Sequence, residues 1–558
     1  MKRLSSDPGN LSRIQKSKTL SILVQGNWGE NLWRKGRSFV STMQSSCIPR
    51  IMDRTQYDTI IVGGGTSGSV LAARLSEDAH RNVLLIERGG DHSSYDDKVL
   101  KAERVWDAAA SRRFSRTRRM RFRGNFLRNN ITVGHTLGGT SAINAMAAVR
   151  GQPEDYDAWS EFGCEGWSWQ DVLPVFKKLE NDLDFQDTKL HSSKGPLPLR
   201  RWRPAEFSLA QHALYQGVQE MGVKVCDDVN DRSKLPGVGV FPGTSRSGTE
   251  RVTVSLAYLT PEVRQRANLT IVTDCPVGKV EFGKGPQAKR VIGVRTQDDR
   301  LILGKEVIVS CGALGSPQLL LLSGVGPQEE LARHQIPPVH DLPGVGRNMQ
   351  EHVGTCFIYR GPYEEELIGS PAKVLWADDY DGNGDINFHI AAAPVRSGPI
   401  IGTISVVPAY HLLPTTRGAV KLNRKNPHGF PDCDLNFLTH PQDLAALQKI
   451  VARILEWEQT RAFKDWGAIR LFPRPTPNTL KKVKWAKRMM TVSYFHAVGT
   501  CAMGSVDDSQ AVLDSQCRVH GIEGLRVVDA SSMPRIIRGN TYLCCTMFAE
   551  RVAEFMNK

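Results

Sequence analysis

Three closely spaced glycines form the clearest chemical motif of the sequence. Gly63, Gly65 and Gly68 stand between a β-branched run at 58–62 and a stretch at 69–77 with apolar residues at helical spacing. In such a turn the first glycine permits a tight bend, the second lets the backbone approach a pyrophosphate, and the third allows close helix–strand packing. The helix N-terminus would add N–H groups and partial positive charge. The motif predicts a dinucleotide site at Gly63, Gly65, Thr66, Ser67 and Gly68.

An acidic residue stands where a nucleotide ribose would need one. Glu87 ends the next apolar run, 83–86, and its carboxylate can accept hydrogen bonds from ribose hydroxyls. A glutamate, rather than a basic pair, argues against a 2′-phosphate on the ligand. Strand, turn, helix, strand and acid together favour a nucleotide over a glycine-rich turn without one. The motif alone does not separate FAD from NAD.

Two polar residues near the C-terminus could carry acid–base chemistry. Histidine has an unperturbed pKa near operating pH, which suits a general base, and His496 precedes a Gly-Thr turn that could place its ring in a cleft. Considered alone, such a histidine is more often structural. Asn540 opens the last expected helix, where asparagine is favoured as an N-cap.

The elements that must position these residues follow an α/β pattern. We expect strands at 58–62, 83–87, 269–272, 307–309 and 525–528, and helices at 69–77, 317–322 and 543–556. The segment 388–438 contains several short β-like runs and predicts an antiparallel sheet. The first strand, helix and second strand form a βαβ unit.

Composition limits the class of protein. The chain has 558 residues, of which 40% are hydrophobic and 23% charged, as in globular proteins. No apolar run approaches the length of a membrane span. The eleven cysteines are scattered without a Cys-x-x-Cys pair, so we expect no disulfide framework, no metal site and a reducing compartment. A cytoplasmic location is expected, with a mitochondrial or peripheral membrane location as the alternatives.

Positive charge is concentrated in two segments of a chain with net charge +14. Residues 1–56 are basic and rich in serine, which fits a mitochondrial transit peptide, a natural translation start at Met52, or a disordered tail. The second segment runs from Arg112 to Arg128 and reads either as a solvated loop or as a contact for anionic lipid or an acidic partner. No nucleic-acid-binding motif accompanies it, so no nucleic acid is expected.

Further segments resemble the glucose-methanol-choline (GMC) family of FAD-dependent oxidoreductases, of the choline and alcohol dehydrogenase type. They lie at 134–144, 149–159, 312–326, 343–352, 496–504 and 527–541, so the resemblance covers about residues 57–558. The resemblance implies a Rossmann-like FAD-binding domain and a discontinuous α+β substrate domain built on an antiparallel sheet. It also implies a leader at 1–56, an FAD region at 57–353 with an insertion at about 156–235, a substrate domain at 354–490 and a C-terminal return at 491–558.

The resemblance also assigns roles along the cofactor. It places Gly138, Gly139, Thr140 and Asn144 along the flavin, Asp529 and Ala530 near its ribityl chain and pyrophosphate, and Val277 in a strand pair on the adenine side. Some members attach FAD covalently through a histidine at the position that resembles Ile143. We therefore expect non-covalent FAD.

The activity implied is oxidation of a small-molecule alcohol to an aldehyde or ketone. His496 would take the hydroxyl proton, Asn540 would bind the alkoxide, and the α-carbon hydride would pass to flavin N5. Oxygen or a quinone-type acceptor would reoxidise the flavin. The alternatives are a lyase of the hydroxynitrile lyase type with a structural flavin, a light-driven decarboxylase, and a flavoprotein that only binds.

Two departures from the family pattern stand out. Val133-Gly134-His135 replaces a common Arg-Gly-Lys, and His135 could add charge near the phosphates. The interval between His352 and Asp385 is shorter than usual and rich in aspartate and glycine. We therefore expect a loop there and an accessible flavin face, unless 202–209 or 471–480 covers the ring.

Overall fold

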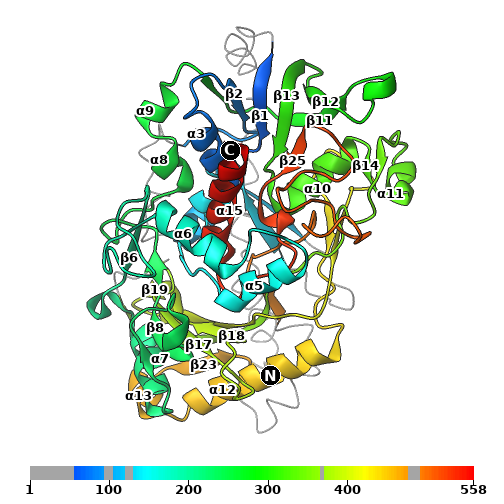
Figure 1. Ribbon diagram of the computed structural model, residues 1–558. Coiled ribbons are helices and arrows are strands. Elements are labelled where there is room, and N and C mark those ends of the chain that lie inside the picture. The colour runs from blue at the N-terminus through cyan, green and yellow to red at the C-terminus, as the bar shows by residue number, and fades with distance from the viewer. Residues whose placement is uncertain (1–55, 93–104, 120–129, 365–369, 475–490, 558) are drawn as a thin grey trace, which may run out of the picture. The chain divides into compact units, whose positions relative to one another are not determined.

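The computed structural model describes residues 56–92, 105–119, 130–364, 370–474 and 491–557 (Figure 1). These residues belong to one compact unit, Pro49–Lys558. The predictions for the leader, up to residue 55, and for Arg121, Arg123 and Arg128 lie outside the described residues. The described cysteines are free thiols. Within the described part of the chain, no helix is both long and apolar enough to cross a bilayer.

A parallel sheet forms the base of the predicted nucleotide domain. Its parallel strands run in the order β10 (Leu269–Val272), β2 (Val83–Ile86), β1 (Tyr57–Val62), β13 (Leu301–Val309) and β25 (Leu525–Val527). Residues 301–303 of β13 instead pair with antiparallel β12 (Val291–Thr296), which pairs with β11 (Val277–Phe282). β2 and nearly all of β1 are buried, as expected for strands covered on both faces. The predicted βαβ unit and α/β class are confirmed.

Three helices near this sheet join distant parts of the chain: the first two contact its strands, and the third packs on the first. They are α3 (Thr66–Leu75), α10 (Gly312–Leu322) and the C-terminal α15 (Thr541–Met556). α15 packs beside α3 (Figure 1), and the Ser67 hydroxyl donates to the Cys545 carbonyl at 3.0 Å. The C-terminal helix therefore packs on the helix that follows the glycine turn, although 478 residues separate Ser67 from Cys545.

A second, mainly antiparallel sheet has nine strands. Seven follow the order β23 (Ile469–Phe472), β16 (Val353–Gly361), β20 (Gly402–His411), β18 (Phe388–Ala391), β17 (Val374–Asp378), β8 (Gly237–Val240) and β7 (Val225–Cys226). β19 (Ala393–Gly398) pairs with β20, and β24 (Thr491–Ser493) pairs with β16. Helices α7 (Leu209–Glu220), α12 (Pro441–Trp457) and α13 (Arg461–Trp466) share its core, in which Phe357, Trp376 and Trp457 are fully buried. This is the predicted antiparallel sheet of the substrate domain.

The antiparallel prediction for 388–438 was wrong in one respect, because the segment does not form one sheet. β21 (Ala419–Lys421) and β22 (Asp432–Asp434) pair only with each other. Gly418, just before β21, instead bridges to Met349, which draws this part of the chain away from the nine-stranded sheet.

Several short elements connect the two sheets. The segment 153–243 contains α5 (Pro153–Glu161), α6 (Trp169–Leu179), β5 (Glu180–Asp182), β6 (Leu197–Arg201) and β9 (Pro242–Gly243), besides α7, β7 and β8. α6 packs on α15, whereas β7 and β8 enter the nine-stranded sheet. α8 (Val254–Tyr258) and α9 (Pro261–Arg264) then lead back to β10. The domain limits given by the sequence stay predictions.

The loop alternative for the second basic segment was wrong where the structure describes it. After α4 (Val105–Ala110), β3 (Ser115–Arg119) pairs antiparallel with β4 (Asn130–Gly134). Thr117 and Thr132 face each other across the pair, with hydroxyl oxygens 2.9 Å apart, a contact that stabilises a hairpin.

The short interval before Asp385 contains two strands in the residues that the structure describes. β16 and β17 occupy 353–361 and 374–378, and the aspartate- and glycine-rich part of the predicted loop connects β17 to β18. There the Asp379 carboxylate accepts from the backbone N–H groups of Asp381 and Gly384, both at 2.6 Å. The proposed alternative cover at 471–480 is described only as far as Arg474. The accessible flavin face stays a prediction.

Candidate active site

The glycine turn between β1 and α3 has the shape of a nucleotide cradle. A Cβ added at Gly68 would lie 1.9 Å from the Gly63 carbonyl oxygen, so helix and turn are in direct contact there. Gly63 itself has φ +102°, a left-handed conformation that favours glycine. A Cβ at Gly65 would meet nothing closer than 3.9 Å, which leaves room for a ligand beside the backbone. α3 begins at Thr66, three residues before the expected start at residue 69, so Thr66 and Ser67 lie in its first turn.

Glu87 fixes the conformation of the glycine turn. Its two carboxylate oxygens accept hydrogen bonds from the backbone N–H groups of Gly64, at 2.9 Å, and Gly89, at 2.8 Å. The side chain is buried, and burial raises its pKa against the opposing effect of these hydrogen bonds. Each oxygen keeps a lone pair that a ribose hydroxyl could use.

The 134–144 segment lies across the same turn. The Gly138 N–H donates to the Gly64 carbonyl at 2.7 Å, and a Cβ at Gly139 would lie 2.7 Å from the Gly65 Cα. The Asn144 N–H donates to the Thr140 carbonyl at 2.9 Å, which closes the turn. The structure thus brings the predicted residues Gly138, Gly139, Thr140 and Asn144 together with the glycine turn.

His135 does not contribute the positive charge that the sequence suggested. Burial, together with the cations of Arg116 and Arg88, lowers the pKa of His135 to about 4. The imidazole is therefore neutral near pH 7 in this structure.

The remaining predicted cofactor residues lie at the strand ends around the turn. The Asp529 carboxylate follows β25 and accepts from the Gly312 N–H at 2.8 Å, which fixes the start of α10. The Ala530 carbonyl accepts from the Gly499 N–H at 3.1 Å and so ties this region to the loop that carries His496. Val277 begins β11, two residues after Cys275, whose N–H donates to the Glu87 carbonyl at 3.0 Å. These positions fit a dinucleotide held between the turn and the ends of the parallel strands.

His496 and Asn540 meet, although 44 residues separate them in the sequence. The Asn540 amide nitrogen Nδ2 lies 3.3 Å from Nε2 of His496. Both side chains are mostly buried, 9% exposed for His496 and 7% for Asn540. Burial, and then the charge of His389, lower the pKa of His496 to about 3. The ring is therefore an uncharged base near neutral pH.

The capping role expected for Asn540 is not the one its side chain performs. Its backbone occupies the N-cap position of α15, but the side chain forms no capping hydrogen bond. The amide turns to His496 instead, so only the backbone has the predicted helix-start role.

Two neighbours of His496 were missed as functional residues. His352 places Nδ1 3.0 Å from Nδ1 of His496, and the Glu351 carboxylate accepts from the His496 backbone N–H at 2.8 Å. Burial raises the pKa of Glu351 to about 8. Both stand in the 343–352 motif, but the sequence does not show that this motif meets residue 496. The pairing of Val353 with Ser493 and of Gln350 with Val498 brings the two segments together.

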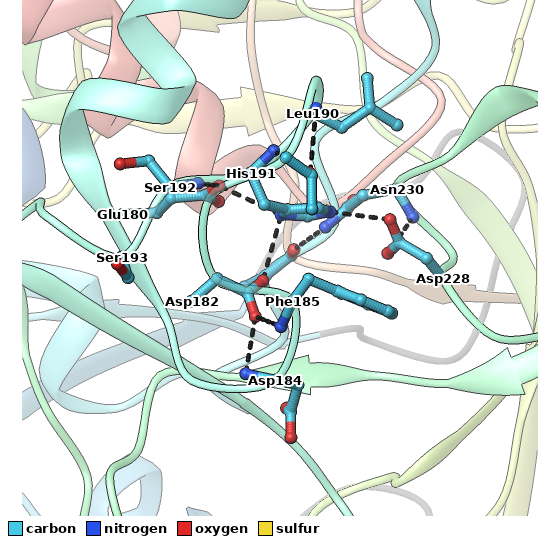
Figure 2. Close-up of polar contacts among 12 residues, drawn as sticks. Glu180, Asp182, Asp184, Phe185, Leu190, His191, Ser192, Ser193, Asp228 and Asn230 are labelled. Atoms are coloured by element: carbon cyan, nitrogen blue, oxygen red, sulfur yellow. Dashed lines mark hydrogen bonds and ion pairs between the residues drawn. The ribbon is translucent and has the colours of Figure 1, made fainter.

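Away from this site, one group of histidine and acidic side chains in the described residues is close enough to hold a metal ion, namely Glu180, Asp182 and His191. Figure 2 shows the His191 imidazole between these acids and Asp228. Its Nε2 lies 2.7 Å from an Asp228 oxygen, and its Nδ1 lies 3.1 Å from oxygens of both Glu180 and Asp182. Burial opposes protonation, but these hydrogen bonds raise the pKa of His191 to about 10. A doubly protonated imidazole has no lone pair for a metal.

Two arginines complete the charge balance of this cluster. Arg150 contacts Glu180 at 2.5 Å, and Arg201 contacts Asp182 at 2.6 Å and Asp228 at 3.1 Å. Three carboxylates are thereby matched by two guanidinium groups and one imidazolium. The arrangement is a neutral buried ion-pair network that joins β5, β6 and the loop before β8.

Known proteins resemble the chain over most of its length. Residues 57–354 and 414–549 each match a sequence profile described as GMC oxidoreductase. A 5-(hydroxymethyl)furfural oxidase from Methylovorus sp. (strain MP688) is 33% identical, covering 90% of this chain and 99% of the relative. A glucose dehydrogenase (FAD, quinone) from Drosophila pseudoobscura pseudoobscura is 34% identical, and the match covers 90% of this chain and 87% of the relative. The crystal structure of pyridoxine 4-oxidase from Mesorbium loti superposes with TM-score 0.80 at 27% identity. The superposition covers 90% of this chain and 99% of that structure's chain.

Proposed function

Because this chain belongs to the GMC oxidoreductase family of FAD-dependent enzymes that act on CH–OH donors, we propose that it oxidises an alcohol to an aldehyde or ketone, with His496 as the base. The observation that carries this proposal is the pairing of a buried, neutral imidazole with a carboxamide N–H donor. A base and a hydrogen-bond donor side by side can serve the same substrate oxygen before and after it loses its proton.

The residues present fit a bound FAD. The turn at Gly63–Gly68 would receive its pyrophosphate, Glu87 its adenosine ribose, and the 138–144 segment would border the flavin. Ile143, at the position that resembles the covalent linkage site of some relatives, offers no nucleophile, so we propose non-covalent attachment. When bound, FAD supplies the two-electron oxidant.

The side chains act on the substrate hydroxyl. His496 Nε2 accepts the hydroxyl proton, and Asn540 Nδ2 donates a hydrogen bond to the alkoxide oxygen that remains. Burial disfavours a free imidazolium, so the protonated ring is stabilised mainly while the negative alkoxide lies beside it. Proton transfer is thereby coupled to the presence of a bound, correctly placed alcohol.

The relatives suggest the range of substrates and acceptors to test. Their names specify 5-(hydroxymethyl)furfural, glucose and pyridoxine as substrates, and one specifies a quinone. We extend this to a small-molecule alcohol for the present chain, with oxygen or a quinone-type compound as the acceptor.

An anaerobic screen tests the proposal. Primary, amino and aromatic alcohols are mixed with the FAD-loaded protein, and flavin absorbance is followed. Bleaching by one class of alcohol, with formation of the corresponding aldehyde or ketone, is expected. If the flavin stays oxidised with every alcohol while a hydroxynitrile is cleaved, the protein is a lyase with a structural flavin and the proposal is wrong.

A further inference from the structure

His352 contacts both His496 and the backbone just before Asn540. Its Nε2 lies 3.0 Å from the carbonyl oxygen of Ile537, three residues before Asn540, and its Nδ1 lies 3.0 Å from Nδ1 of His496. The side chain is fully buried, and its ring meets that of His496 edge-on, with centroids 5.2 Å apart. The ring therefore bridges the loop before α15 and the loop after β24.

The partner of Nε2 decides where the His352 proton lies. A carbonyl oxygen can only accept a hydrogen bond, so Nε2 of His352 must carry hydrogen. Burial, and then the neighbouring His496, His389 and His411, hold the pKa of His352 well below its usual value, so the ring is singly protonated. Its Nδ1 is then a bare lone pair.

The lone pair on Nδ1 of His352 also decides where the His496 proton lies. A lone pair on Nδ1 of His352, 3.0 Å from Nδ1 of His496, requires hydrogen on the latter atom, since two lone pairs at that distance repel. A neutral imidazole has one N–H, so Nε2 of His496 is left unprotonated. The carboxamide Nδ2 of Asn540, a donor, is the group that faces it.

We propose that His352 is a positioning residue that holds His496 in the tautomer whose Nε2 is free to accept the substrate proton. The inference rests on the proposed function of His496 as base. His352 has no role in contacting the substrate. It acts through the His496 ring, while the Glu351 carboxylate fixes the backbone of the same residue.

Two amide substitutions separate the tautomer role from mere packing. In His352→Asn the amide oxygen Oδ1 is bonded to Cγ, as Nδ1 is in histidine. It can therefore still accept a hydrogen bond from Nδ1–H of His496. In His352→Gln the amide extends toward the Nε2 position and Ile537, and the acceptor at Nδ1 is lost. We expect the first variant to keep most of the flavin-reduction rate, and the second to lose on the order of 10²–10⁴-fold in kcat with KM little changed.

The pH profile and a spectroscopic signature distinguish the mechanism from misfolding. His352→Gln should lower the plateau of kcat against pH without moving its limiting pKa, because a tautomer ratio does not depend on pH. Nitrogen NMR of ¹⁵N-histidine-labelled, FAD-loaded protein, with His496→Ala for assignment, should show Nδ1–H and bare Nε2 for His496 in the wild type. In His352→Gln the two tautomers should mix.

The rate and NMR measurements each have a result that would overturn the inference. Equal rates for the two amide variants, or a wild-type spectrum with hydrogen on Nε2 of His496, would overturn the inference. If His352→Gln does not retain FAD, the wild-type spectrum and the His352→Asn rate still decide it. If no alcohol reduces the flavin, the proposed function fails, but the spectrum still reports the tautomer.

Discussion

The Asn540 carboxamide lies 3.3 Å from Nε2 of His496, although the Asn540 backbone occupies the N-cap position of α15. The side chain gives up the capping bond that its residue type favours and contacts the catalytic candidate instead. The helix-start role of the Asn540 backbone and the active-site role of its side chain can therefore be tested separately.

Asn540→Ala should slow flavin reduction while leaving the folding stability nearly unchanged. A hydrogen bond to a charged oxygen contributes about 1.5–3 kcal/mol, or roughly a 10–10²-fold change in rate. No capping bond is lost, so the melting temperature should stay close to that of the wild type.

Ser168→Ala is a suitable contrast, because the Ser168 hydroxyl does cap α6. It should lower stability by about 1 kcal/mol and leave the reduction rate intact. Rapid-mixing absorbance and thermal unfolding measure the two effects. A marked fall in melting temperature for Asn540→Ala would mean that the residue is mainly structural.

His496→Ala should retain FAD but reduce the flavin about 10²–10⁴-fold more slowly, the usual contribution of a positioned base. The imidazole is mostly buried beside His352 and Asn540, so the variant removes the proton acceptor without touching the glycine turn. His520→Ala removes a histidine that lies against the Gly504 carbonyl and serves as the control. An unchanged rate for His496→Ala in single-turnover absorbance measurements would exclude it as the base.

The sequence predicts structure that depends on neighbouring residues better than contacts between distant segments of the chain. The strand at 58–62, the glycine turn and Glu87 follow from spacing within a short stretch, and the structure confirms the βαβ unit they form. His352 was visible only as part of a motif, because the register that pairs Val353 with Ser493 involves backbone atoms 140 residues apart along the chain (493 − 353). The hairpin of β3 and β4 was missed for a related reason, since clustered arginines mask strand propensity.

Glu87→Ala should weaken FAD binding more than it affects chemistry. The substitution leaves the Gly64 and Gly89 N–H groups without their carboxylate acceptor and removes the predicted ribose ligand. Each hydrogen bond to a charged group contributes about 1.5–3 kcal/mol, so Kd for FAD should rise at least about 10-fold. Quenching of flavin fluorescence on binding gives Kd, and the reduction rate at saturating FAD is the control. Unchanged affinity would show that the turn is stable without this carboxylate.

The His191 network should make folding stability depend on pH in a defined window. The folded-state pKa of His191, about 10, lies above the unfolded value of about 6.5. Its contribution is therefore complete below about pH 6.5 and is lost as the pH rises toward 10. Burial would raise the pKa of Asp182, but hydrogen bonding from His191 and the charge of Arg201 hold it below its usual value. The contribution of the Asp182 carboxylate to stability is therefore lost on acidification.

Denaturant unfolding between pH 5 and 10 measures this dependence, and His191→Leu identifies its source. Removing the imidazolium leaves buried carboxylates with less compensating charge, which should destabilise the fold by about 3–5 kcal/mol near pH 6. The difference between variant and wild type should shrink as the pH approaches 10, because the wild-type ring then loses its own charge. Added Zn²⁺ should not stabilise the wild type, since both ring nitrogens carry hydrogen and the carboxylates already contact arginines. A difference that stays constant across the pH range, or a clear stabilisation by Zn²⁺, would contradict the ion-pair assignment.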